Sequence, residues 1–232
     1  MITVSILTQL GTYILYIFLP LFALYVGYLI ITKAFNEMGF SSIEAVIIVF
    51  VSFLLGYGLI DQYVGFSFSN IHLFTHGEYW KVGINTGGAI IPIILSIYLS
   101  IKNKIKPTKI IIAIVLVTIV TYIVTSPDPE KGIISKFPYW LAPVIVASII
   151  SIILTWKYKR SSAAPLAYIS ATFGVLIGAD FLHLITLLQT EIETTRNAVI
   201  GGANVFDMIF VTGILAVIID GIILYEQKKG SS

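Results

Sequence analysis

Two aspartates are unusual in this chain because each lies within a long apolar stretch. Asp180 lies nine residues before Gln189, where one stretch ends, and Asp207 lies nine residues after Ala198, near the start of the next. A charged side chain deep in a membrane helix costs about 2.5–3.5 kcal/mol, so such a residue points to a function. Because a helix rises about 1.5 Å per residue, we expect both carboxyls at the same depth, about 13 Å below one membrane surface.

The two carboxyls could act as a pair if their helices are neighbours, which the short connection between them favours. Small residues precede both aspartates, namely Gly178-Ala179 and Gly201-Gly202-Ala203, and small residues let helix backbones approach closely. Two carboxylates at that range cannot both be ionised, so the pair would share a proton. A pair of this kind can serve as general acid and general base. Whether the side chains face each other depends on helix rotation, which the sequence leaves open.

Further polar and small residues are expected around this pair. His183 follows Asp180 by three positions and Asn204 precedes Asp207 by three, so each shares a helix face with its aspartate. A Gly-Gly pair and a proline within one apolar stretch indicate a locally broken helix, which is tolerated where it lines a cavity. We therefore expect a polar pocket for a substrate or ion, open to the outside and formed by Asn85, Gly87, Gly88, Pro92, His183, Gly201, Gly202 and Asn204.

The favoured interpretation of this pocket requires no metal and no other cofactor. A metal bound by the two aspartates and His183 is the alternative, since carboxylate and imidazole suit several divalent ions. His72 and His76 lie together near residue 74, but no third ligand is close to them in the sequence. We expect these two histidines to be solvated at the membrane surface.

Composition excludes several classes of protein. Hydrophobic residues make up 57% of the 232 residues and charged residues only 11%, against about 25% charged in soluble domains. The mean hydropathy is +0.97. These values exclude an ordinary soluble enzyme, a disordered chain and a nucleic-acid-binding protein. The absence of cysteine excludes disulfides, thiolate metal sites and a cysteine nucleophile.

The elements that position the aspartates are expected to be membrane-spanning helices in an all-α bundle. A crossing needs about 20 apolar residues, and we predict about seven spans, at 10–32, 44–64, 82–101, 108–126, 139–156, 164–188 and 199–225. With the N-terminus outside and the C-terminus cytoplasmic, ten of the 14 Lys and Arg residues fall on the cytoplasmic side, as the positive-inside rule requires. The chain is thus predicted to be one multi-pass domain of the cell membrane over residues 1–229, with 230–232 as a possible expression scar.

The segment between the second and third spans differs from the rest. Residues 65–81 alternate apolar and polar side chains around Thr75-His76-Gly77-Glu78, which favours a short outer hairpin or lid. Two further acids, Asp61 and Asp220, lie near the ends of apolar stretches. We expect Asp61 to reach headgroups and water, and Asp220 to extend towards the surface or cap a helix.

Several motifs from the third span onward are similar to a known family. They are Asn85-Thr-Gly-Gly-Ala-Ile-Ile-Pro92, Pro165-Leu-Ala-Tyr168, Leu176-Ile-Gly-Ala-Asp180 and the run from Gly201 to Gly213. The chain resembles an archaeal and bacterial family of multi-spanning membrane proteins, domain of unknown function 1614. This resemblance implies no activity.

A weaker likeness concerns intramembrane aspartyl proteases of the presenilin and signal-peptide-peptidase type. The apolar run after Asp207 is similar to the run after their second catalytic aspartate, and Asp180 would then take the place of the first. Phe206 and Ala179 replace the glycine and tyrosine that precede those aspartates. In those enzymes a Pro-Ala-Leu motif lies on a helix after the one that carries the second aspartate. We predict no span after the one that carries Asp207, so this motif has no counterpart here.

Three functions are compatible with these observations. The first is peptide hydrolysis by an intramembrane aspartyl protease-like pair, with a transmembrane peptide as substrate. The second is a proton- or cation-coupled transporter in which the same acids bind a small ion. The third is a structural or accessory membrane protein. Membrane lipids are partners in all three cases, no nucleic acid is expected, and the oligomeric state is not predicted.

Overall fold

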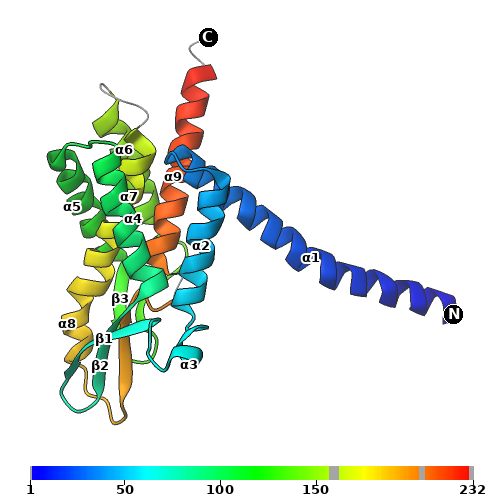
Figure 1. The fold of residues 1–232 in the computed structure, drawn as a ribbon, viewed down its shortest axis with the longest axis horizontal. Helices are drawn as coiled ribbons and strands as arrows, with labels where there is room; N and C mark the ends of the chain where they lie inside the picture. Colours follow the sequence, from blue (N-terminus) through cyan, green and yellow to red (C-terminus); the bar gives the residue numbers. More distant parts are fainter. Residues whose placement is uncertain (1, 157–161, 204–206, 230–232) are drawn as a thin grey trace.

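A computed structural model describes residues 2–156, 162–203 and 207–229, and the chain is mainly helical (Figure 1). Asn204 and residues 230–232, named above, lie outside the described residues. The α-helices are α1 Ile2–Glu37, α2 Ser42–Gly56, α3 Asp61–Val64, α4 Ile91–Lys102, α5 Pro107–Val124, α6 Ala142–Thr155, α7 Ala163–Val175, α8 Leu182–Leu188 and α9 Met208–Lys229. Shorter helical turns are the π-helices η1 Thr86–Ile90 and η4 Leu176–Phe181 and the 3-10 turn η2 Tyr139–Leu141.

Among the described residues, three helical segments are long and apolar enough to cross a membrane, namely Leu15–Glu37, Pro107–Val124 and Ala163–Leu188. Four shorter apolar segments accompany them, at Ser42–Gly56, Thr86–Lys102, Tyr139–Thr155 and Met208–Leu224. Each of the predicted spans overlaps one of these segments. The prediction of a helical membrane protein is confirmed at this level, while the count of seven crossings and the orientation stay predictions.

The prediction of an all-α fold is wrong at one end of the molecule, where strands gather (Figure 1). The strands are β1 Asn70–His76, β2 Trp80–Asn85, β3 Thr125–Asp128, β4 Gly132–Ser135 and β5 Arg196–Ile200. The expected hairpin near 65–81 is present, since β1 and β2 pair antiparallel around the turn at Gly77. β5 adds to β2 in parallel to give the sheet order β1-β2-β5, and β3 and β4 form a second hairpin.

Two of these strands, β2 and β5, include the first residues of predicted spans. Residues 82–85 and 199–200, read as the first residues of the third and seventh spans, belong to β2 and β5. Both segments are short and rich in β-branched residues, which pack well on a pleated surface. The third and seventh spans therefore start as strands and become helical only afterwards.

Helix α7 lies at the centre of the bundle and is buried at nearly every position from Ala163 to Val175. It packs against α9, α5, α6 and α4. Its small residues permit this close packing, since a Cβ on Gly174 would lie 2.5 Å from Val117 of α5. α7 continues through η4 into α8, so the central helix carries Asp180 directly into the strand end of the molecule.

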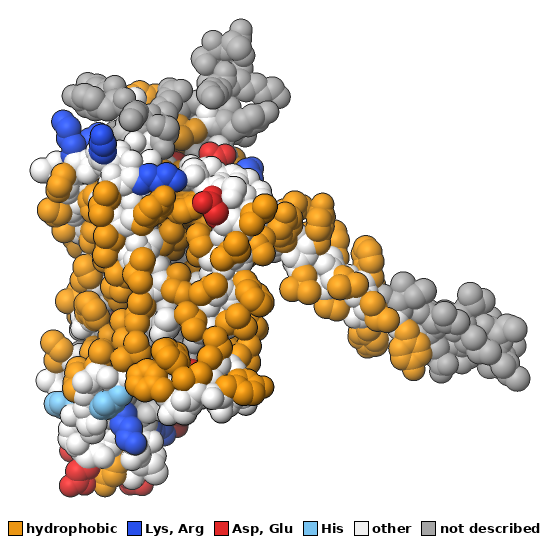
Figure 2. Space-filling model, in the orientation of Figure 1, with side chains coloured by type: hydrophobic (Ala, Val, Ile, Leu, Met, Phe, Trp, Pro, Cys, Tyr) orange, Lys and Arg blue, Asp and Glu red, His pale blue; other side chains and the backbone are white. Residues whose placement is uncertain are grey.

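The outer surface supports insertion into a membrane. Figure 2 shows apolar side chains over the sides of the helices, with charged side chains at the two ends. Helix α1 leaves the bundle (Figure 1), and its described apolar side chains are exposed from Tyr13 to Leu24. Only its last turns pack against the bundle, through Ala34 and Phe35. An apolar surface of this extent is compatible with lipid and not with water.

Asp61 does not extend to headgroups as an isolated acid but holds the loop before β1. Its carboxylate accepts hydrogen bonds from the Ser69 hydroxyl at 2.6 Å, the Ser67 hydroxyl at 3.2 Å and the Phe68 N–H at 2.9 Å. These donors, with the Ser69 hydroxyl first, lower the pKa of Asp61 below its ordinary value of 3.8. The ionised carboxylate therefore stabilises the loop between α3 and β1.

We predict that Asp61→Asn lowers the melting temperature at pH 7, because the amide accepts these bonds less well than a carboxylate. The folded protein favours ionised Asp61, so its contribution is present above pH 3.8 and is lost as the pH falls through the lowered pKa. The gap in melting temperature between wild type and Asp61→Asn, measured in detergent, should close as the pH approaches 3. A gap of constant size would contradict this role.

Candidate active site

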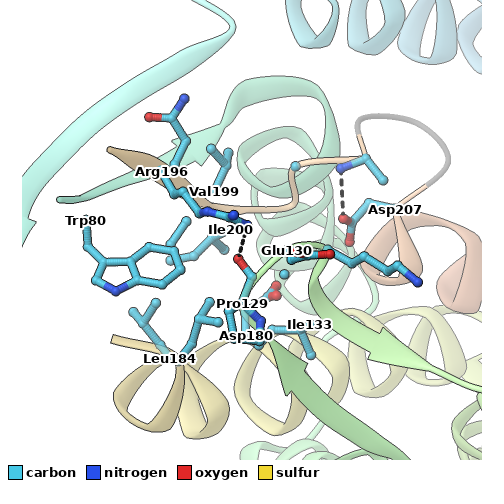
Figure 3. Close-up of a pocket in the computed structure, with 17 residues that line it drawn as sticks. Trp80, Pro129, Glu130, Ile133, Asp180, Leu184, Arg196, Val199, Ile200 and Asp207 are labelled. Carbon is cyan, nitrogen blue, oxygen red and sulfur yellow. Dashed lines mark hydrogen bonds between the residues drawn. The ribbon is translucent and has the colours of Figure 1, made fainter. Parts of the chain in front are cut away.

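Asp180 and Asp207 line the same cavity of about 510 Å³ at the strand end of the molecule (Figure 3). One wall is β5 and the turn that follows it, and the other is the turn and first residues of the β3–β4 hairpin. Trp80, Leu184 and Leu187 add apolar side chains. The sequence predicts two carboxyls near each other, and in the structure both line one cavity.

Asp180 reaches the cavity from η4, the π-helical turn between α7 and α8. Behind this turn α5 packs so closely that a Cβ on Gly178 would lie 2.6 Å from the Thr118 carbonyl oxygen. The backbone N–H of Gly201 lies near the Asp180 carboxyl. Its Oδ2 is buried and has no hydrogen-bond partner within the described residues. A buried carboxyl oxygen with no partner is costly unless it is protonated or meets a ligand.

Asp207 lies at the start of α9, and its predicted position nine residues inside the seventh span is wrong. Strand β5 and the turn at Gly201-Gly202 occupy the residues that were expected to be helical. The Asp207 carboxylate accepts the Ile209 N–H at 2.9 Å and the Ala203 N–H at 3.2 Å, the second of which is drawn in Figure 3. Asp207 therefore caps the helix, a common role for aspartate at this position.

The two aspartates approach one cavity from different elements, η4 and the start of α9. The turn after β5 lines the same cavity through Gly202 and Ala203, and its Ala203 N–H bonds Asp207. The two carboxyls are close enough for the charge of Asp207 to act on Asp180, so the protonation of one depends on the other.

His183 does not join the pair. Its ring stacks on Tyr122, with centroids 4.5 Å apart, and its Nε2 lies 3.2 Å from the Tyr122 carbonyl oxygen. Within the described residues, no group of three His, Asp or Glu side chains could hold a metal ion. The alternative of a metal bound by both aspartates and His183 is therefore not supported by the geometry.

Asn85 connects neighbouring elements through hydrogen bonds and is not among the residues that line the cavity. Its amide donates to the Gly56 carbonyl oxygen at 3.0 Å and to the Asn70 side chain at 2.9 Å, and its Oδ1 accepts the Gly88 N–H at 2.8 Å. It thereby joins α2, β1 and η1. The broken helix predicted from the Gly-Gly pair is present as η1, but it serves helix packing, since a Cβ on Gly87 would lie 2.1 Å from the Ser52 carbonyl oxygen.

Two of the remaining predicted residues also have packing roles. Pro92 is buried in the first turn of α4, and Gly201, with a φ of +69°, turns the chain against Ala89. Gly202 does line the cavity. Of the residues predicted for the pocket, Asp180, Asp207 and Gly202 are therefore together, whereas Asn85, Gly87, Gly88, Pro92, His183 and Gly201 are not among the residues that line it.

Sequence reasoning missed the other charged residues of the cavity, which are Glu130 and Lys131 on the β3–β4 turn and Arg196 on β5. Arg196 donates from Nη1 to the Pro129 carbonyl oxygen at 2.8 Å and so links β5 to the β3–β4 turn (Figure 3). The turn is shaped by Asp128, whose carboxylate accepts the N–H groups of Glu130 and Lys131. These bonds lower the pKa of Asp128. The proline- and glycine-containing run from Pro127 to Gly132 was the available signal for this hairpin.

Comparison with known proteins places the chain in a family. Residues 56–219 match the family model described as Protein of unknown function (DUF1614). The chain belongs to this family. The matched range includes every residue that lines the cavity, so the cavity lies wholly in the family domain, while α1 and most of α2 lie outside the match.

The other comparisons add no relative. No curated protein and no solved structure matches this chain. The likeness to presenilin-type proteases therefore finds no support, and any function for this DUF1614 protein has to be argued from its cavity.

We predict that Arg196→Gln loosens the β3–β4 hairpin, because it removes the bond from the guanidinium to the Pro129 carbonyl oxygen. Hydrogen exchange of the backbone amides in 125–135 should become faster by about fivefold to tenfold, the effect of one hydrogen bond of about 1 kcal/mol. Lys131→Gln is the matched control, since it removes a charge from the same cavity and leaves that bond intact. Equal exchange in both variants would argue against a linking role for Arg196.

Proposed function

We propose that this protein hydrolyses peptide bonds with Asp180 and Asp207 as a shared acid and base. The observation that supports this is that two electrostatically interacting carboxyls line one open cavity, where a buried Asp180 oxygen has no hydrogen-bond partner among the described residues. The cavity wall beside them is strand backbone, which can bind a peptide through its amides and carbonyls.

The two aspartates would have different roles. Asp207 accepts two backbone N–H groups at a helix N-terminus, and both favour the ionised carboxylate. Asp180, with its unpartnered oxygen, is the better position for the shared proton. Asp207 would take a proton from a water molecule while Asp180 donates a hydrogen bond to the scissile carbonyl.

The reaction balances without a further reactant. The water oxygen bonds to the carbonyl carbon to give a tetrahedral intermediate, and the proton from Asp180 moves to the carbonyl oxygen. The carbon–nitrogen bond then breaks as Asp207 returns its proton to the leaving nitrogen. Asp180 recovers its proton when the new carboxyl group forms, so the pair ends in its initial state.

The membrane orientation would place this cavity at the outer face. The basic residues Lys102, Lys104 and Lys106 lie between α4 and α5, at the end of the bundle away from the strands. With seven crossings and a cytoplasmic location for that end, the strands and both aspartates face outward. The substrate would then be a polypeptide of the cell membrane or its outer surface.

A transporter that binds a proton or cation would use the same carboxyls. No specific observation favours it over hydrolysis, and within the described residues no group of three His, Asp or Glu side chains could hold a metal ion. A structural or accessory role gives no reason for two carboxyls to line one cavity. The unpartnered oxygen alone does not decide this, since Asp220 Oδ2 is also buried without a partner among the described residues. We therefore retain hydrolysis as the proposal.

We predict that Asp180→Asn and Asp207→Ser each reduce cleavage of a fluorogenic transmembrane reporter in liposomes by about 10²–10⁴-fold. Serine can keep the helix cap at position 207 while removing the carboxylate, so loss of activity there would not reflect unfolding. Asp220→Asn is the matched control. Asp220 is also a buried aspartate, but it accepts the Ser151 hydroxyl at 3.0 Å between α6 and α9 and does not line the cavity.

The outcomes separate the candidate functions. Cleavage by wild type and by Asp220→Asn, but by neither variant of the pair, would support hydrolysis. Absence of cleavage by wild type, together with pH-driven uptake that Asp180→Asn abolishes, would replace the proposal with the transporter. Equal cleavage by wild type and both variants of the pair would remove any role for the aspartates.

A further inference from the structure

We propose that the cavity binds its substrate as an extended polypeptide segment that adds to the free edge of β5. This inference deepens the proposed function and rests on it for the fate of the bound segment, although binding itself can be measured without hydrolysis. It assigns a peptide-binding role to Asn197 and Val199 and an apolar side-chain preference to the site.

Strand β5 is paired on one side only within the described part of the chain. The sheet order is β1-β2-β5, so β2 covers one edge of β5 and the other edge carries no strand. The Arg196 N–H donates to the Tyr79 carbonyl oxygen at 2.8 Å. Alternate residues of a parallel strand bond to the same neighbour, so Arg196, Ala198 and Ile200 direct their peptide groups to β2. Asn197 and Val199 direct theirs to the opposite edge.

This opposite edge runs along the cavity and leads to the carboxyls. Asn197 and Val199 both line the cavity. Gly201 is the next residue in the same alternation, and its N–H lies near Asp180. The Gly202 N–H then bonds the Val199 carbonyl oxygen at 3.1 Å, which closes a turn, and Ala203 bonds Asp207. A segment bound along this edge would therefore carry its backbone past both aspartates.

The dimensions and lining of the cavity fit an extended segment. β5 contains five residues, which at about 3.3 Å per residue gives an edge of about 13 Å between its first and last residue. Across the gap lie Gly132 and Ile133 of β4. Trp80, Leu184 and Leu187 supply an apolar surface for a side chain of the bound segment. A helix would not fit this arrangement, because its backbone groups are already paired.

The other edge of the same sheet provides an internal comparison. β1 is also an edge strand, but all seven of its residues are exposed. The cavity beside β1, which Asn197 and Val199 also line, includes neither aspartate among its lining residues. Unpaired edges bind added strands in general. What distinguishes the β5 edge is the cavity with its two carboxyls, so binding should prefer β5 over β1.

The absence of cysteine in this chain permits a direct test, because a single introduced cysteine is then the only thiol. Two variants are prepared in the Asp180→Asn background, which prevents cleavage: Asn197→Cys on β5 and Ile71→Cys on β1. The probe is a capped seven-residue peptide of alternating valine and threonine with a central cysteine activated as a thiopyridyl disulfide. Adjacent strands bring Cβ atoms within disulfide range.

We expect at least tenfold faster disulfide formation at Asn197→Cys than at Ile71→Cys. The same peptide without cysteine should compete at the β5 position. In a second comparison, the thiol is placed at Val199→Cys, and labelling is measured with and without the additional change Asn197→Pro. Proline removes the N–H of residue 197 from the free edge, so labelling should become slower by about tenfold, the effect of one lost backbone hydrogen bond. Proline is tolerated where the N–H faces away from the neighbouring strand, so Asn197→Pro should melt within a few degrees of its parent.

The results decide the two proposals separately. Equal labelling at both edges, or Asn197→Pro with unchanged labelling, would overturn strand addition at β5 even if the wild type cleaves the reporter. Preferred labelling at β5 in a protein whose wild type cleaves nothing would support the binding site and remove the hydrolytic function.

Discussion

Peptide groups in apolar surroundings need hydrogen-bond partners, and this requirement decides where the chain can leave the helical conformation. Within the bundle the backbone stays helical, with π-helical turns at η1 and η4. In the part of the chain that the structure describes, strands occur at one end, where β2 pairs with β1 and β5 and where β3 pairs with β4. The irregular turn at η1 is closed by the side chain of Asn85, which satisfies groups of Gly56, Asn70 and Gly88. The cavity is therefore built at the end where the chain is extended.

The position of the two carboxyls follows from the same constraint. Asp180 belongs to the segment that continues the central helix α7, whose small residues let it pack on α5, α6 and α9. Asp207 belongs to the first turn of α9, where free N–H groups need an acceptor. The turn between β5 and α9 bonds Asp207 through Ala203 and passes close to Asp180 at Gly201. A rigid helix, a helix terminus and one turn thus provide the geometry of the pair.

Much of this could be predicted from the sequence, because the signals involved are long or local. Apolar stretches predict the helices, the turn at Gly77 predicts the β1–β2 hairpin, and the short connection predicts that Asp180 and Asp207 are neighbours. The position of Asp207 could not be predicted, because Ala198–Ile200 reads as the start of an apolar span and Gly201-Gly202 reads as helix packing. Hydrogen bonding over long range makes β5 a strand, since its partner β2 lies more than a hundred residues away. From the sequence, Asn85 is assigned to the pocket for the same reason. Its hydrogen-bond partners Gly56 and Asn70 lie on other elements, so the sequence does not show that its amide is already bonded.

The bond from Arg196 to the Pro129 carbonyl oxygen joins the two walls of the cavity. A substrate that moves these walls apart would have to break this hydrogen bond. The free energy of breaking it would reduce the binding affinity of every such substrate by the same amount. Weak binders would then remain outside, while a guest with enough backbone contacts of its own could enter. The Arg196 guanidinium would thus set a minimum binding energy for entry into the cavity, and this minimum would not depend on the side chains of the substrate.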